Sequence, residues 1–187
     1  MVTVISLWLP ILLSAVLVFV VSALIHMVLR YHRNDYRRLA NEDAVLGVLQ
    51  ATPPGDYIAP YASTPQDMKA PEYLEKRKRG PLVIMTVAGG AQMGMGKQLL
   101  QWFLYAIVVG VFAAYIAGRA VPPGGAYLEV FRFAGTTAFI GYSLALWHDS
   151  IWYKRAWGTT LRFTLDGLIY ALLTAGTFGW LWPAATL

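Results

Sequence analysis

The chain has 187 residues, of which 57% are hydrophobic and only 13% are charged, and its mean hydropathy is +0.50. Soluble domains carry about 25% charged residues, so this composition argues against an ordinary soluble protein. The absence of cysteine excludes disulfides, thiol catalysis and thiolate metal sites. The net charge of +5 comes from basic residues that flank apolar runs without any nucleic-acid-binding motif, so we expect no nucleic-acid partner.

Residues 1–29 contain the first predicted membrane span, an apolar run that begins at residue 5. A helix needs roughly 20 such residues to cross the core of a bilayer. A signal peptide would begin with a basic segment, but the first basic residue here is Arg30, and Arg33, Arg37 and Arg38 follow it. This polarity predicts an uncleaved span with its N-terminus outside.

Residues 30–97 are too polar to span a membrane and are predicted to form a long cytoplasmic loop. They hold ten of the 15 Lys and Arg residues, and basic residues gather on the cytoplasmic side of membrane proteins. Asn41 and the two acidic residues after it predict the start of a short helix. A second short helix is expected over 71–79, with Gly80 as its terminator.

The second short helix ends in a basic run of four residues, which are Lys76, Arg77, Lys78 and Arg79. This run is either a solvated charge cluster that fixes topology or a contact for anionic lipid head groups. Residues 57–61 are expected to form a turn. Residues 81–87 are apolar and β-branched but too short to span, so they are a strand, an interfacial segment or a re-entrant piece.

The glycine-rich run 89–97 has glycines and a lysine as a phosphate loop does. Its spacing is wrong, however, and Gln98 stands where a phosphate loop requires Ser or Thr. We therefore predict that 89–97 is a flexible entry into the next span rather than a nucleotide site.

Residues 98–187 are predicted to form three further membrane helices, with spans at 99–118, 128–152 and 161–182. With the first span they give an all-α integral membrane protein of four transmembrane helices, with a long cytoplasmic loop between helices 1 and 2. Basic residues also lie between the last two spans. The positive-inside pattern then places both termini in the periplasm of a bacterial inner membrane.

Small residues recur every four positions on the second and fourth predicted spans, which puts them on one stripe of each helix. The stripes are Ala106, Gly110, Ala114 and Gly118, and Gly167, Ala171, Ala175 and Gly179. They predict packing faces, and the partner is either the same chain, another copy of it or a different membrane subunit.

Asp166 is the main candidate for chemistry, because ionisable residues inside a membrane are usually functional. Arg162 lies four residues earlier on the same predicted helix, at the spacing of an ion pair within that helix. Asp166 therefore either pairs with Arg162, takes part in ion or proton movement, or grips a partner subunit. His148 and Asp149 are further candidates for the transport role.

His26 and His148 are both expected near the inner face on different helices, where a histidine pair can ligate a b-type haem. One pair of unequal depth gives little support for haem, so no cofactor and no metal site are predicted. His148, Asp149 and Ser150 do not form a catalytic triad, because neighbouring helix residues point about 100° apart. Asp149 is instead expected to pair with a basic residue that follows it.

These features favour a structural or accessory subunit of the inner membrane that packs through its Gly/Ala stripes against itself or a larger membrane complex. A small oligomeric transporter or channel using Asp166 is the first alternative. A haem- or quinone-binding membrane subunit using His26 and His148 is the second. The expected partners are the lipid bilayer and further copies or subunits, and no motif in the sequence names an enzymatic reaction.

Overall fold

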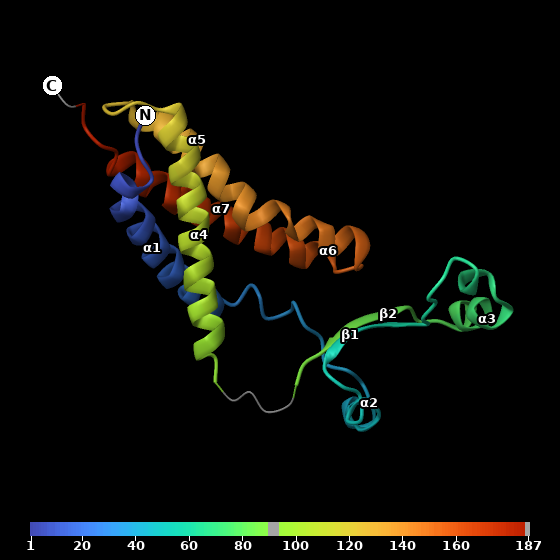
Figure 1. The fold of residues 1–187 in the computed structure, drawn as a ribbon. Helices are drawn as coiled ribbons and strands as arrows, with labels where there is room; N and C mark the ends of the chain where they lie inside the picture. Colours follow the sequence, from blue (N-terminus) through green and yellow to red (C-terminus); the bar gives the residue numbers. More distant parts are fainter. Residues whose placement is uncertain (90–93, 186–187) are drawn as a thin grey trace. The chain divides into compact units, whose positions relative to one another are not determined.

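The computed structural model describes residues 1–89 and 94–185, and it is mostly helical (Figure 1). The chain divides into two compact units. One consists of Met1–Tyr36 and Gly94–Leu187, and we call it the helical unit. The other consists of Arg37–Met93, and we call it the insert.

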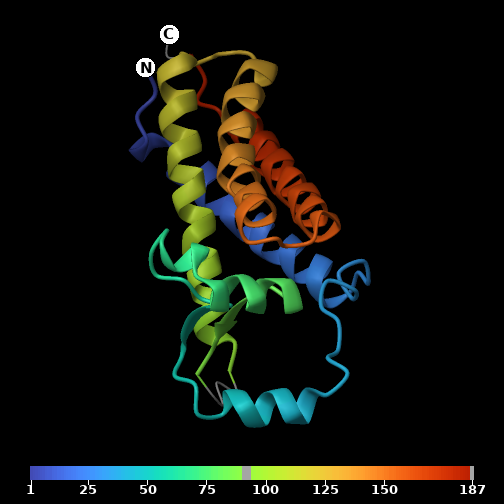
Figure 2. The ribbon, with the colours of Figure 1, turned by 90° about the vertical axis from the view of Figure 1, so that its right-hand side faces the viewer.

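The helical unit is built from long helices that pack in a closed order. Its elements are η1 (Ile5–Leu7), α1 (Trp8–Met27), α4 (Gly96–Ala120), α5 (Tyr127–Phe139), the π-helical segment η3 (Ile140–Leu144), α6 (Leu146–Trp152) and α7 (Trp157–Trp180). Helix α1 packs against α4 and α7, and α5 packs against the same two helices. Figure 2 shows α5 and α7 side by side.

Two helical segments, Ile5–Met27 and Gly96–Ala120, are long and apolar enough to cross a membrane. The sequence predicted four spans, so this test supports a membrane location without confirming the full number. The third predicted span is divided because η3 interrupts the α-helix between α5 and α6. Helix α7 has the length, but Arg162 and Asp166 lower its hydropathy.

Helix α7 exposes leucines and buries several polar side chains together with small and aromatic ones. Its exposed leucines are Leu161, Leu165, Leu168 and Leu172, and its buried polar residues are Thr159, Thr160, Asp166, Thr174 and Thr177. An amphipathic helix of a soluble protein instead directs charged and polar residues outward. The outer faces of α1 and α4 are also apolar, with exposed residues such as Leu12 and Phe112.

Both small-residue stripes lie against other segments of the same chain. A Cβ atom added to any of four stripe glycines would contact a neighbouring segment. The contacts are Gly110 with Ile11, Gly118 with Val2, Gly167 with Tyr142 and Ser143, and Gly179 with Tyr127. The stripe alanines, Ala106, Ala114, Ala171 and Ala175, are at most 2% exposed. The stripes thus pack the helices of one chain together and give no separate support for an oligomer.

The two chain ends are tied to the connection between α4 and α5. The Val2 amide donates to the Gly118 carbonyl at 3.0 Å, and the Gly124 amide donates to the Pro183 carbonyl at 2.8 Å. Gly124 has a φ of +76°, a conformation that favours glycine. Figure 1 and Figure 2 both show the termini at the same end of the helical unit.

The insert contains α2 (Glu42–Leu49), η2 (Asp67–Lys69), α3 (Pro71–Arg79) and one two-stranded antiparallel sheet. The two short helices predicted from the sequence are confirmed, and Gly80 caps α3 with a φ of +56°. Strand β1 (Gly55–Ala59) pairs with β2 (Val83–Val87), with Tyr57 opposite Met85.

The expected turn at 57–61 is therefore wrong for its first half, because pairing with β2 extends that segment into a strand. The strand alternative for 81–87 is confirmed over the five residues of β2. Within the glycine-rich run, residues 90–93 lie outside the described residues.

Candidate metal centre at His26, His32 and Asp166

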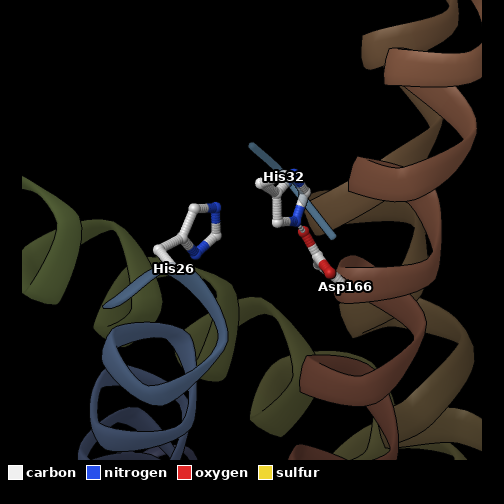
Figure 3. A group of neighbouring side chains, drawn as sticks. All are labelled: His26, His32 and Asp166. Atoms are coloured by element: carbon white, nitrogen blue, oxygen red, sulfur yellow. Dashed lines mark ion pairs between the residues drawn. The ribbon is translucent and has the colours of Figure 1, made fainter. Parts of the chain in front are cut away.

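Three potential metal ligands converge at one end of the helical unit (Figure 3). His26 lies on the last turn of α1, His32 follows α1, and Asp166 lies on α7. The chain after α1 bends back in successive turns, with the Leu29 amide bonded to the Leu24 carbonyl and the Asp35 amide bonded to the His32 carbonyl. One ligand atom from each of the three side chains lies within 4.8 Å of the others.

The His32 ring lies between two carboxylates. Its Nδ1 atom is hydrogen-bonded to Asp35 Oδ2 at 2.6 Å. Its Nε2 atom lies 2.8 Å from Asp166 Oδ2, which is ion-pair distance. The second contact is not aligned as a hydrogen bond, so among the described residues both atoms are buried without a hydrogen-bond partner. Buried polar atoms of this kind are uncommon in folded proteins and point to a missing partner.

Asp35 is almost fully buried, with a side chain 3% exposed, and it is held by two partners. Arg162 Nε donates to its Oδ1 atom at 2.8 Å, and a second guanidinium nitrogen of Arg162 contacts the same oxygen. Burial acts to raise the pKa of Asp35, but the bonds from His32 and Arg162 outweigh it and leave this pKa below its ordinary value. Asp35 is therefore an anion.

Tyr31 holds the other oxygen of Asp166. Its hydroxyl donates to Asp166 Oδ1. Burial, followed by the contact with Asp166, raises the pKa of the Tyr31 hydroxyl above its ordinary value, so the hydroxyl keeps its proton and remains a donor. Asp166 Oδ1 is thus satisfied, and Oδ2 is the atom directed at His32.

The polar contacts of both histidines leave Nε2 available. His26 Nδ1 lies 3.0 Å from the Ser22 carbonyl oxygen, which can only accept, so Nδ1 carries the proton. The neutral ring then has its lone pair on Nε2. The Asp35 carboxylate selects the same tautomer in a neutral His32 ring. The two rings are stacked, with centroids 4.7 Å apart and planes 9° apart.

This arrangement has two features of a metal site. A ligating histidine usually donates its other ring N–H to a carboxylate or a backbone carbonyl, which are the groups that Asp35 and Ser22 supply. Two imidazoles and a carboxylate suit zinc, iron, nickel or copper. Ligand atoms of a tetrahedral zinc site lie about 3.3–3.5 Å apart, so these three atoms, which lie within 4.8 Å of one another, would draw closer around an ion.

The charges of the cluster also favour a cation. Asp35 and Asp166 bring two carboxylates, and Arg162 brings one guanidinium. With a neutral His32, one buried negative charge is left over. A buried charge is costly unless it is paired. The excess negative charge is offset either by a proton on His32 or by a metal ion held by His32 Nε2 and Asp166 Oδ2.

The ion pair of Arg162 in the structure differs from the one predicted from the sequence. Arg162 binds Asp35, so the expected ion pair between Arg162 and Asp166 within α7 does not form. Because Asp35 lies closer to the guanidinium in space, the partner comes from another segment. Asp149 pairs with Arg155 at 3.6 Å, which is the kind of pair expected from the sequence.

The His26 ring stacks on His32, a residue that the haem alternative with His26 and His148 did not include. His148 is exposed on α6, and its ring packs near Trp152 and Tyr153. The basic run that ends α3 is exposed, and two of its members form surface pairs, Lys76 with Glu72 and Lys78 with Glu75.

Sequence reasoning missed Tyr31, His32 and Asp35. They lie at the start of the segment that was interpreted as a basic loop setting the topology. A signal was present, because His26, His32 and Asp35 are spaced as H-x5-H-x2-D directly at the end of the first span. The third ligand comes from α7, which no local pattern connects to this segment.

No protein-family model matches the chain, and comparisons with curated proteins and with solved structures gave no significant match.

Proposed function

We propose that the chain is a four-span protein of a bacterial inner membrane that binds one divalent transition-metal ion through His26, His32 and Asp166. The observation that carries the metal is the close approach of His32 Nε2 and Asp166 Oδ2, two buried atoms that share no hydrogen bond. A metal ion accepts a lone pair from each of them and offsets the excess negative charge of the two carboxylates. This proposal keeps the accessory role expected from the sequence and adds a ligand to it.

The four-span arrangement is supported by the distribution of polar side chains in the helical unit. Helix α7 directs leucines outward and holds Asp166 and Thr174 inside. In a bilayer, ionisable side chains face the interior of a helix bundle. The position of both chain ends beside the α4–α5 connection supports a topology with both termini on one side, which we assign to the periplasm.

The main alternative to a metal ion is a protonated His32 that bridges Asp35 and Asp166. The role of His26 distinguishes a metal site from this protonated bridge. The His26 ring has no place in the electrostatic bridge, whereas a metal ion needs one of its nitrogens as the third protein ligand. Transport by Asp166 has less support, because this side chain is 2% exposed and is held by Tyr31 and His32.

The test uses the full-length chain purified in detergent, treated with a chelator and then dialysed against zinc. Elemental analysis should find about one metal ion per chain, as for any site with one set of ligands. His26→Ala should lower zinc affinity by about tenfold or more while leaving the metal-free protein as stable as the wild type. His32→Ala and Asp166→Asn should also lose the metal. His148→Ala is the matched control and should retain it.

The proposal is overturned if the wild type retains no zinc, cobalt, nickel or iron after dialysis. It is equally overturned if His26→Ala and His148→Ala bind zinc equally well. In that case the cluster is an ion-pair network centred on a protonated His32.

A further inference from the structure

A cavity of about 400 Å³ opens onto the candidate metal centre. Helices α1, α4, α6 and α7 and the segment η3 contribute to it, with residues from Phe19 on α1 to Tyr170 on α7. Its volume falls within the range of about 300–1,000 Å³ that small-molecule sites occupy. The cavity is therefore large enough for an organic ligand in addition to a metal ion.

One end of the cavity is polar. His26 and Asp166 line it, and so does Tyr170. The Tyr170 hydroxyl is buried, and it has no hydrogen-bond partner in the described part of the chain. Burying a hydroxyl without a partner costs free energy. A ligand oxygen that accepts a hydrogen bond from Tyr170 would remove this cost.

The rest of the cavity is apolar and largely aromatic. Phe19, Trp102 and Phe163 form part of the wall, together with Met27 and Leu99. Trp102 is fixed in place, because its indole N–H donates to the Ser22 hydroxyl at 2.8 Å. Aromatic walls favour a flat ring, which stacks on them face to face or edge to face.

The charge of the polar end selects the ligand further. Asp166 lies at this end, and Asp35 lies behind it on the far side of His32. In the metal-free protein, a fatty acid or a phosphate ester would bring a further negative charge beside these carboxylates, which is unfavourable. A hydroxyl or carbonyl oxygen on a neutral ring can accept from Tyr170, and a ring hydroxyl can also donate to Asp166.

We infer that this cavity binds the head group of a lipid quinone or quinol. A ring oxygen accepts from the Tyr170 hydroxyl, a quinol hydroxyl can also donate to Asp166, and the ring lies against Trp102 and Phe163. The inference rests on the proposed function, because both assume that the helical unit is a membrane bundle with His26 and Asp166 at one end. It concerns binding alone. The apolar tail would leave the cavity into the lipid.

The test uses the full-length chain in nanodiscs and a radiolabelled benzoquinone with a decyl tail, with empty nanodiscs as the blank. The wild type should show one saturable site. Ala23 lines the cavity, and Ala23→Phe should weaken binding by about tenfold or more because it fills the space. Ala145 is exposed outside the cavity, so Ala145→Phe is the matched control and should bind like the wild type.

Tyr170→Phe keeps the shape of the wall and removes only the hydroxyl. It should weaken quinone binding by about twofold to tenfold, the value of one hydrogen bond. If Ala23→Phe does not fold, Leu146→Trp fills the same cavity from α6. Equal binding by the wild type and the filled variant, or stronger displacement by oleate than by unlabelled quinone, overturns the inference.

The two proposals fail separately. Saturable quinone binding without retained zinc would support this inference and overturn the metal site. One zinc ion per chain without saturable quinone binding would overturn this inference alone. His32→Ala, which does not line the cavity, should lose zinc and keep the quinone.

Discussion

Arg162 on α7 donates from Nε to Asp35 Oδ1 at 2.8 Å, across 127 positions of the sequence. This bond fastens the segment after α1 to α7 and fixes the position of His32, which is hydrogen-bonded to the same carboxylate. Because Arg162 is engaged by Asp35, Asp166 is left to Tyr31 and His32. The candidate metal centre thus depends on a residue that is not itself a ligand.

Replacing Arg162 with methionine should lower the free energy of unfolding by about 1.5–3 kcal/mol, because Asp35 would keep its buried charge and lose a charged partner. The measurement is unfolding of the purified protein in mixed micelles, followed by circular dichroism. Arg33→Met is the control, since Arg33 is exposed in the same segment. Equal stability of the two variants would show that the pair with Asp35 contributes little.

The helices of this protein could be predicted from local sequence where a long apolar run or a capping residue marks them. The apolar runs after residues 5 and 99 became the helices that end at Met27 and Ala120. Asn41 and Gly80 marked the start of α2 and the end of α3. Hydropathy says nothing about hydrogen-bond register, so it missed the π-helical segment Ile140–Leu144 that divides the third predicted span.

The candidate site could be predicted only in its outline. Asp166 stood out because a carboxylate is costly inside a membrane, and its importance did not depend on knowing its partners. The partners Tyr31 and His32 are more than 130 positions away, and only the folded chain brings them together. The haem alternative paired His26 with His148 because both are expected near the inner face on different helices, whereas His32 lies in the segment interpreted as a basic loop.

Gly167→Ala should destabilise the protein by about 1–3 kcal/mol, because overpacking a close helix contact forces its neighbours apart. The added methyl would collide with the Ser143 hydroxyl and lie 3.2 Å from both Cβ and the carbonyl oxygen of Tyr142. Gly176 on the same helix is the matched position, since its nearest neighbour would be the Tyr127 hydroxyl at 3.6 Å.

Gly176→Ala should leave the protein unchanged or stabilise it by about 0.5–1 kcal/mol, because alanine is the better helix former. Unfolding in mixed micelles distinguishes the two variants. Similar values for both would contradict the close packing of α7 against η3.

Tyr170→Phe should raise the free energy of unfolding by about 1 kcal/mol when no ligand is present, because it removes a buried hydroxyl that lacks a partner in the described part of the chain. The same variant is expected to bind quinone less well. A variant that is more stable and binds less well has lost a functional group rather than a structural one. A clear loss of stability would show that the hydroxyl has a structural partner.

Asp67 should keep its local loop ordered at acidic pH. Bonds from Ser63 and Thr64 hold the pKa of this carboxyl below its ordinary value. Because the pKa of Asp67 is lowered in the folded chain, the ionised carboxylate holds the loop fully above the ordinary pKa of 3.8. The loop loses this order as the pH falls through the lowered pKa of Asp67. Carbon-detected NMR titration checks this, and Ser63→Ala should move the Asp67 pKa back toward 3.8.

The topology can be read with single cysteines, because the natural chain has none. Val2 and Pro183 are bonded to the α4–α5 connection, so Thr3 and Pro122 should lie on the periplasmic side. Thr3→Cys and Pro122→Cys should react with a membrane-impermeant maleimide in intact spheroplasts. Arg33→Cys and Tyr153→Cys should react only after the membrane is opened, because basic residues beside both positions favour the cytoplasm.

The pattern over all four reporters is what tests the span number. Four spans place Pro122 and Tyr153 on opposite sides, because α5, η3 and α6 then cross the bilayer between them. Two spans, Ile5–Met27 and Gly96–Ala120, would leave Pro122 and Tyr153 on the same side. Labelling of Tyr153→Cys in intact spheroplasts would therefore reject the four-span topology, and would place His26 and Asp166 in a bundle that is only partly embedded in lipid.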